Sequence, residues 1–262
     1  MSKKEIYASY GIVYENGKIF APVFGFINPL LINGNAKLGK GVWTFSTLAG
    51  TEIYNVSING TDYAVKGTCV CDCKGCYAKS GFFRMSSTIK SLAIKTILCR
   101  EHMDFVKRAI IAQIKADNIE LCRIHASGEF FSADYADMWK YVVSICKECN
   151  FWTYTKVRDF ESIFDDLENG NIVKSVIPGT GFNFGHAEYI MSAYEKLSAN
   201  GEKVHICKCG IDKNQHCTNC KGCSENKYVL FLEHSTSYKP ETDSADSWEE
   251  FKALVEKLNA NR

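Results

Sequence analysis

The chain has 262 residues, of which 46% are hydrophobic, and 31 basic against 30 acidic side chains leave a net charge of +1. This length and apolar content suffice for one large domain or two small ones. The balanced charge argues against a nucleic-acid partner bound through a broad basic face. No apolar run approaches the roughly 18 residues of a membrane span, and the start lacks a secretory signal. We therefore expect a cytoplasmic protein with no membrane partner.

Residues 1–66 are predicted to form a β-rich extension packed on the rest of the chain. Aromatic and β-branched residues recur in IYASYGIVY and KIFAPVFGFI. The segment YNVSINGTDYAV contains Asn59-Gly60, a pair that favours a two-residue hairpin turn. Residues 86–117 begin with two serines and continue with apolar residues at helical spacing, which predicts a long amphipathic helix.

Strands and helices alternate in the rest of the sequence, which implies a parallel sheet with helices outside it. Strands are predicted at 119–125, 151–157, 172–178, 203–207 and 227–234, and helices at about 133–147, 158–168, 186–199 and 246–259. One more strand just before Cys69 makes six. Six strands are too few for a closed eight-stranded barrel, so the predicted fold is an open, partial six-stranded parallel βα barrel over residues 67–262. A cysteine-rich loop at 207–223 takes the place of one helix.

The segment GTCVCDCKGCYAKSG contains a C-x3-C-x2-C motif formed by Cys69, Cys73 and Cys76, with Cys71 inside the first gap. In a reducing cytosol, clustered cysteines are more often metal ligands than disulfides. Three thiolates on one short loop hold three irons of a [4Fe–4S] cluster and leave the fourth iron open. Structural zinc is the alternative, although it prefers two separated cysteine pairs. We call Cys69, Cys73 and Cys76 the first cysteine group.

A second motif, C-x2-C-x2-C, is formed by Cys217, Cys220 and Cys223. This run is typical of bacterial ferredoxins, in which a more distant cysteine completes the ligand set. Cys207 ends a predicted strand and is the favoured fourth ligand of a second, auxiliary [4Fe–4S] cluster, with Cys209 as the other choice. A structural zinc site is the alternative. Cys207, Cys217, Cys220 and Cys223 are called the second cysteine group, and metal binding there is expected to order the loop.

The first motif resembles that of the radical S-adenosylmethionine (SAM) superfamily, in which three cysteines bind a [4Fe–4S] cluster whose open iron chelates SAM. That family has an aromatic residue just before its last cysteine, whereas here Tyr77 follows Cys76. The chain is also similar to small phage- and plasmid-associated radical-SAM-like proteins. The similarity runs through NAKLGKGVWTF, the cysteine loop, RIHASGEFFSADYADMW, FWTYTKVR and VHICKCG with CTNCKGC.

The resemblance also implies SAM-binding residues at the carboxyl ends of the strands, where parallel α/β folds bind ligands. The family's Gly-Gly-Glu-like turn, which holds the SAM amino group, is matched by Ser127-Gly128-Glu129 after the predicted strand at 119–125. The remaining candidates stand at strand ends, in the loop or in a glycine-rich turn, and an ordinary structural role is the alternative for each. They are Tyr77, His125, Thr155, Lys156 and Asn183.

By this resemblance the chain is expected to be an enzyme that cleaves SAM reductively. The products would be methionine and a 5′-deoxyadenosyl radical, which abstracts hydrogen from an unidentified substrate. The implied protein partner is a one-electron reductant such as a flavodoxin or ferredoxin, and no catalytic side chain is singled out. Two other hypotheses are a non-cleaving iron–sulfur electron carrier or sensor on the same fold, and a zinc-stapled binding module.

Overall fold

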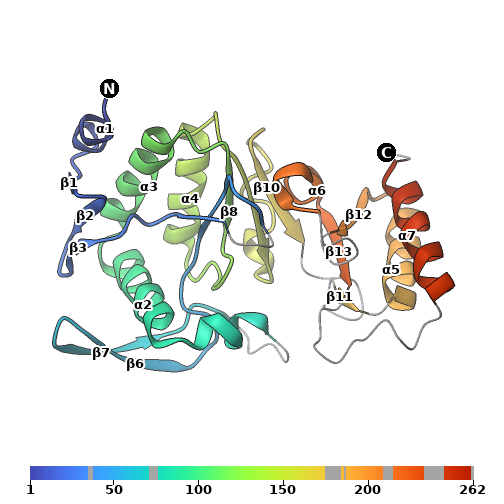
Figure 1. Cartoon of the computed structure of the whole chain (residues 1–262), viewed down its shortest axis with the longest axis horizontal. Coiled ribbons are helices and arrows are strands. Elements are labelled where there is room, and N and C mark those ends of the chain that lie inside the picture. The colour runs from blue at the N-terminus through green and yellow to red at the C-terminus, as the bar shows by residue number, and fades with distance from the viewer. Residues whose placement is uncertain are drawn as a thin grey trace.

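The computed structural model describes residues 1–34, 38–70, 76–174, 184–185, 187–208, 215–232 and 245–260. Figure 1 shows an elongated molecule whose N-terminal elements lie at one end and whose C-terminal elements lie at the other. In these ranges the helices are α1 (Lys3–Ser9), α2 (Ser86–Glu101), α3 (Met103–Asp117), α4 (Ala133–Ile145), α5 (Ala187–Ala199), α6 (Gly222–Glu225) and α7 (Ala245–Ala260). None of them is long and apolar enough to cross a membrane.

The strands of the described residues form four separate sheets. They are β1 (Tyr14–Glu15), β2 (Lys18–Ala21), β3 (Gly25–Ile27), β4 (Ile32–Asn33), β5 (Val42–Phe45), β6 (Ile53–Ile58), β7 (Thr61–Lys66), β8 (Leu121–Ile124), β9 (Asn150–Thr155), β10 (Gly170–Lys174), β11 (Phe184–Gly185), β12 (Val204–Ile206) and β13 (Tyr228–Leu232). The sheet orders are β1-β2-β3, β10-β9-β8-β5-β4, β11-β13-β12 and β6-β7.

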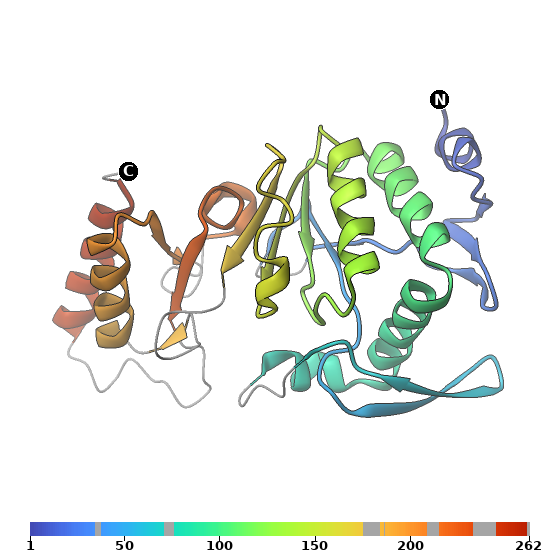
Figure 2. The same cartoon turned by 180° about the vertical axis from the view of Figure 1, so that it is seen from behind.

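The largest sheet is mixed. Its strands β5, β8, β9 and β10 pair in parallel, whereas β4 pairs antiparallel with β5. Figure 2 shows α3 and α4 side by side against one face of this sheet. Burial alternates along β8, where Cys122 and Ile124 are buried and Leu121 and Arg123 are partly exposed. This period of two places Cys122 and Ile124 in the main core and the other two side chains on the opposite face.

The predicted six-stranded parallel partial barrel is wrong, because the strands divide between a mixed sheet and a separate three-stranded sheet. The strand before Cys69 is β7, and it pairs antiparallel with β6 instead of entering the large sheet. The position beside β8 is taken by β5, which comes from the N-terminal segment. A hairpin closes a much shorter loop than a pairing between β7 and β8 would, so the local pairing costs less conformational entropy.

The structure confirms one predicted turn and corrects two predicted helices. The hairpin turn at Asn59-Gly60 is confirmed, and both residues have positive φ as such a turn requires. The long helix expected over 86–117 is interrupted at His102, which separates α2 from α3. The helix predicted at 158–168 is wrong, since the described structure there is a 3₁₀ turn at Arg158–Phe160 followed by turns.

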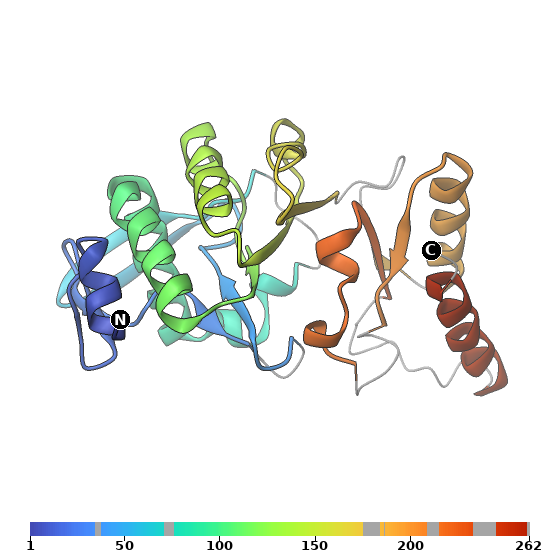
Figure 3. The ribbon, with the colours of Figure 1, turned by 90° about the horizontal axis from the view of Figure 1, so that it is seen from above.

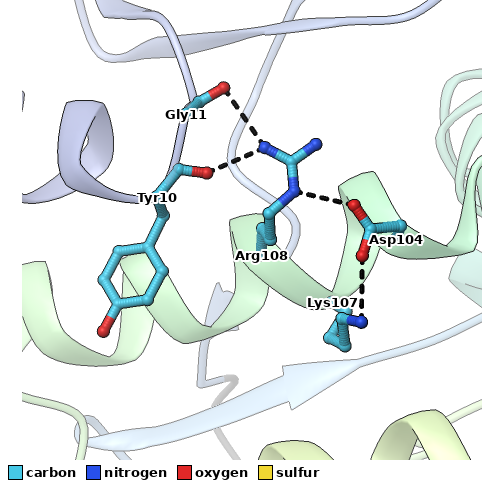
Figure 4. Close-up of polar contacts among 5 residues, drawn as sticks. All are labelled: Tyr10, Gly11, Asp104, Lys107 and Arg108. Atoms are coloured by element: carbon cyan, nitrogen blue, oxygen red, sulfur yellow. Dashed lines mark hydrogen bonds and ion pairs between the residues drawn. The ribbon is translucent and has the colours of Figure 1, made fainter.

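The N-terminal segment begins with α1, where the sequence predicted a β-rich start. Ser2 caps this helix by accepting a hydrogen bond from the Glu5 backbone, and the Glu5 carboxylate accepts one from the Ser2 backbone in return. Arg108 of α3 then holds the chain after α1. Its guanidinium donates to the carbonyl of Tyr10 at 2.8 Å and is oriented by Asp104 at 2.9 Å (Figure 4).

The C-terminal part is built on the three-stranded sheet, with all described strand pairs parallel. Figure 3 shows α5 and α7 together at the far side of this sheet, and α6 between it and the large sheet. A separate small core lies here, made by Ile190, Ala193, Leu197, Val204, Ile206, Leu230 and Val255. Because α6 packs on both β9 and β10, the second cysteine group comes up against the large sheet.

Candidate functional site

The turn Ser127-Gly128-Glu129 lies just after β8, at the carboxyl end of the parallel strands. Gly128 has φ +89°, a backbone conformation that other residues rarely adopt. A Cβ atom on Gly128 would lie 1.9 Å from the Thr47 hydroxyl and 2.8 Å from the Thr68 hydroxyl. The Ser127 hydroxyl also donates to the Thr47 carbonyl at 2.9 Å. Glycine is therefore required here both for its φ and for the close approach of the two threonines.

Thr68 connects this turn to the start of the cysteine loop. Its hydroxyl donates to the Leu48 carbonyl at 2.9 Å and accepts a hydrogen bond from the Glu129 backbone N–H at 3.0 Å. The Thr47 hydroxyl lies 3.0 Å from the Thr68 hydroxyl and forms a further hydrogen bond with it. Thr68 is 2% exposed, so these bonds form away from water. The next residue is Cys69, and the first cysteine group therefore begins directly beside the turn.

The Glu129 carboxylate is buried and bridges β8 to the end of β9. Oε1 accepts hydrogen bonds from the Thr155 hydroxyl and the Phe130 backbone, both at 2.9 Å. Oε2 accepts one from the Lys156 backbone N–H, also at 2.9 Å. Burial raises the pKa of the carboxyl to about 7, although the hydrogen bonds oppose this shift. A nearby cation would therefore strongly favour the ionised form.

His125 points into the main core behind the turn. Its Nε2 lies 2.9 Å from the Tyr135 hydroxyl, and its ring packs edge-on against Phe130. Burial, reinforced by the charge of Arg123, lowers the pKa of His125 to about 3, so the imidazole is neutral at pH 7. Its φ is +58°, which places strain immediately before the turn. His125 thus supports the turn from the core side.

Several buried polar atoms of the main core lack a hydrogen-bond partner among the described residues. Lys95 of α2 is 4% exposed, and its amine lies 5.7 Å from the centre of the Phe45 ring. Among the described residues, Lys95 Nζ, His125 Nδ1 and Trp139 Nε1 have no hydrogen-bond partner. Burial lowers the pKa of Lys95 to about 8. An amine held in this way costs free energy, because water has been removed without a compensating hydrogen bond.

The first cysteine group is only partly described. Cys69 and Cys76 are partly exposed, while Cys73 and Cys71 lie outside the described residues. The Cys69 backbone donates to the Gly50 carbonyl at 3.1 Å, which fixes the start of the loop. Four other thiols, those of Cys99, Cys122, Cys146 and Cys149, are buried in the main core. Burial raises the pKa of all four thiols, and they pack among the apolar side chains of the main core.

The second cysteine group lies against the face of the large sheet that carries Trp152 and Tyr154. Cys217 and Cys223 pack with Trp152 and Tyr154 of β9. Cys207 and Cys223 belong to a second small apolar cluster together with Val173 and Val229. The Tyr154 hydroxyl donates to the Cys223 sulfur at 2.8 Å. The Cys220 sulfur lies 3.4 Å from Nε2 of His205, a 7% exposed residue of β12. Cys209 is outside the described residues.

In the described part of the chain, no three Cys, His, Asp or Glu side chains lie close enough together to hold a metal ion. The thiols of the second cysteine group lie in one region of the molecule, but they do not surround a common position that a metal ion could occupy. Their chemistry fits iron or zinc, since thiolates are the preferred protein ligands of iron–sulfur clusters and of structural zinc. A metal bound there would have to draw the loop together.

The structure brings together most of the residues predicted for the SAM site. Ser127, Gly128, Glu129, Thr155 and the Lys156 backbone meet at one end of β8 and β9. Tyr77 begins a 3₁₀ turn after the cysteine loop, and His125 lies behind the turn in the core. Asn183 lies outside the described residues.

Three residues of this arrangement were missed from the sequence: Thr47, Thr68 and Tyr154. Thr68 carried a signal, since it stands immediately before the first cysteine of the motif. Tyr154 also carried one, because it shares the two-residue period of β9 with Trp152 and so faces the same side of the sheet. Nothing in the local sequence around Thr47 points to its partners, which are 21 and 80 positions away in the chain.

Comparison with known proteins changes the family assignment. The family model described as Gene product 88, a phage-type family, matches residues 29–226, well over half of the chain. No curated protein and no solved structure matches. The assignment to the radical SAM superfamily is therefore wrong: the matching family is a different one, and the described strands do not form the barrel expected of that superfamily. The association with phages, in contrast, agrees with the match, and the chain belongs to the Gene product 88 family.

Proposed function

We propose that this chain is an iron–sulfur enzyme that binds SAM beside the Ser127-Gly128-Glu129 turn and cleaves it reductively. The hydrogen bond from the Glu129 backbone to the Thr68 hydroxyl, at 3.0 Å, carries the proposal. Because Thr68 precedes Cys69, this bond keeps the start of the first cysteine group beside a buried carboxylate. A cluster held by Cys69, Cys73 and Cys76 would therefore lie at the carboxyl edge of parallel strands, where such folds bind ligands.

The Glu129 carboxylate suits the ammonium group of SAM. Among the described residues Oε1 accepts two hydrogen bonds and Oε2 one, so Oε2 keeps a lone pair for a further donor. Its three donors hold the carboxylate in place before a ligand arrives. An ammonium group would stabilise the ionised carboxylate, whose pKa burial has raised to about 7. The chain thus supplies a placed and poorly hydrated acceptor.

The chemistry itself would come from the cofactors. A reduced [4Fe–4S] cluster held by Cys69, Cys73 and Cys76 would supply the one electron that reductive cleavage of SAM into methionine and a 5′-deoxyadenosyl radical requires. The chain's own part is to position SAM and to exclude water from the site. Phe130 and Thr155 are both fully buried beside Glu129, and they would exclude water from the side of the site that faces the strands. The electron would come from a one-electron reductant such as a flavodoxin or ferredoxin.

Each of the two rival functions is favoured by one observation. The Glu129 carboxylate already has three intramolecular donors, and a carboxylate with a purely structural role would look the same. This favours a non-cleaving iron–sulfur electron carrier or sensor. His205 beside Cys220 adds an imidazole to the second cysteine group, as in zinc sites with mixed ligands, and favours a zinc-stapled binding module.

Anaerobic reconstitution with iron and sulfide, followed by metal analysis and reduction with SAM present, separates these functions. We expect about eight irons per chain, as two [4Fe–4S] clusters require, and formation of 5′-deoxyadenosine. Cys76→Ala should lose about half of the iron and all of the 5′-deoxyadenosine. Cys146→Ala, which removes a buried core thiol, is the matched control and should lose neither.

The remaining outcomes decide among the rivals. Stoichiometric zinc without iron would contradict both iron–sulfur functions. Full iron content without 5′-deoxyadenosine, for several reductants, would favour the non-cleaving carrier. Glu129→Gln should keep its iron but bind SAM more weakly, because a neutral amide attracts an ammonium group less than a carboxylate does.

A further inference from the structure

The sheet β1-β2-β3 carries a row of exposed apolar side chains on one face. Phe20 and Phe26 lie directly opposite each other on β2 and β3, with their ring centres 5.3 Å apart. The register of β1 and β2 places Val13 opposite Phe20 on the other side, where the Phe20 backbone N–H donates to the Val13 carbonyl at 3.0 Å. Directly opposed residues share one face of an antiparallel sheet, so the row crosses all three strands. We call Val13, Phe20 and Phe26, which are 51%, 51% and 44% exposed, the exposed apolar row.

The other face of this sheet is already buried. Ile19 and Ala21, which alternate with Phe20 along β2, belong to the main core. An antiparallel sheet with one face on the core commonly has a polar outer face, whereas contiguous exposed apolar side chains are typical of interaction sites. Figure 1 shows this sheet at the N-terminal end of the molecule. It also precedes residues 29–226, so the family match does not cover it.

The turn between β2 and β3 exposes one more apolar side chain. The Phe24 backbone N–H donates to the Pro22 carbonyl at 2.7 Å, which makes Val23 the centre of a three-residue γ-turn. Val23 has φ +66°, a strained conformation for a β-branched residue, and is 64% exposed. Glycine would adopt this φ without strain. Packing within the chain therefore does not account for the valine, whereas a partner that covers the turn would.

Two opposite charges stand beside the exposed apolar row. Glu15 and Lys18 oppose each other across β1 and β2, and each lies two residues from a member of the row and so on the same face. Among the residues that the structure describes, neither side chain has an ion-pair partner. In a face-to-face pair of sheets with a two-fold axis parallel to the strands, between β1 and β2, Glu15 lies opposite the partner's Lys18 and Val13 lies opposite the partner's Phe20. The face is thus complementary to itself in charge and in apolar contact.

We propose that this face of the sheet β1-β2-β3 binds a second copy of the chain in a two-fold symmetric dimer. Packed sheets lie about 10 Å apart, which glutamate and lysine side chains can span together. The net charge of +1 gives no long-range repulsion between copies. A sheet this small buries less than the roughly 1,200–2,000 Å² of a standard interface, so we expect a weak dimer with a dissociation constant on the order of 10–100 µM. The turn after β8 is not part of this face, and the dimer does not depend on the proposed function.

Sedimentation equilibrium of the full chain measures the association. The protein is kept reduced and anaerobic, so that no disulfide joins two copies, and is studied from about 5 to about 500 µM. Phe20→Gln should raise the dissociation constant at least about tenfold, because it places an amide at the centre of an apolar contact. The matched control is Phe82→Gln, which makes the same change at a residue that is 82% exposed on the 3₁₀ turn Gly81–Arg84 and should leave the constant unchanged.

Two charge variants test the two-fold arrangement. Glu15→Lys makes this part of the face wholly positive, and Lys18→Glu makes it wholly negative, so like charges oppose each other in either homodimer. Each variant alone should dimerise several-fold more weakly than the wild type. In an equimolar mixture the positive face of one variant meets the negative face of the other, and association should return at least to the wild-type level. The same two proteins are present before and after mixing, so misfolding of a variant could not produce this recovery.

Three outcomes would overturn the proposal. A chain that stays monomeric over the whole concentration range would exclude a second copy, and a protein of different sequence would then be the occupant of this face. A dimer that Phe20→Gln leaves unchanged, or that Phe82→Gln weakens equally, would place the association elsewhere. A mixture of the two charge variants that associates no better than either variant alone would refute the two-fold arrangement.

Discussion

Replacing Thr68 by valine tests the connection between the cysteine loop and the turn after β8. Valine has nearly the same shape but lacks the hydroxyl that accepts from the Glu129 backbone at 3.0 Å and donates to the Leu48 carbonyl at 2.9 Å. The Leu48 carbonyl keeps a second partner, the backbone N–H of residue 68, at 2.8 Å. The Glu129 N–H, in contrast, is left buried and unpaired.

The expected cost follows from these contacts. A buried donor without a partner costs about 1–3 kcal/mol, and a lost hydrogen bond about 1 kcal/mol more. Thr68→Val should therefore lower the free energy of unfolding by about 2–4 kcal/mol. Thr68→Ser keeps the hydroxyl and loses one methyl group, at a cost of about 1 kcal/mol.

Urea unfolding, followed by circular dichroism under anaerobic conditions, measures both values. The iron content of each reconstituted variant is the second readout, and we expect Thr68→Val to bind less iron than Thr68→Ser. If the valine variant is as stable as the serine variant and binds as much iron, the hydroxyl does not hold the loop, and the site described here is wrong.

Three further predictions concern other parts of the fold. Gly128→Ala should cost at least about 2 kcal/mol from the positive φ and the clash with two hydroxyls, whereas Gly25→Ala, at a similar φ with open space around it, should cost less in the same urea assay. Lys95→Met should raise stability by up to about 3 kcal/mol at pH 7, from the lowering of the Lys95 pKa by burial. Because the folded protein binds fewer protons than the unfolded chain between about pH 8 and 10.5, the wild type gains stability over that range, and the advantage of methionine should shrink by pH 10. Asp104→Asn, in the contact of Figure 4, should cost less than about 1 kcal/mol because the ion pair is exposed, and Arg108→Met should cost more because two backbone carbonyls also lose a donor; equal melting temperatures for these two variants would contradict that ranking.

The local chemistry of the chain was readable from its sequence because it depends on residues that are neighbours in the chain. Asn59-Gly60 specifies a hairpin turn through the φ angles that these two residues tolerate. The spacing of the two cysteine groups indicated thiolate ligands, and Ser127-Gly128-Glu129 was selected by its position after a strand. The helices α4, α5 and α7 were anticipated from apolar residues that recur every three or four positions.

Pairing between distant segments was decided only in the tertiary structure. The sequence of a strand does not specify which other strand it pairs with. We therefore expected β7 in a parallel sheet, whereas β7 forms a hairpin with β6, and β5 takes the position beside β8. The same holds for the contacts of the site. Thr68, Glu129 and Thr155 are separated by 61 and 26 positions, and their hydrogen bonds form only because the segment after β7, the turn after β8 and the end of β9 come together. Sequence patterns determine which side chains can bond, but long-range packing determines which ones meet, because bringing distant segments together depends on the whole core.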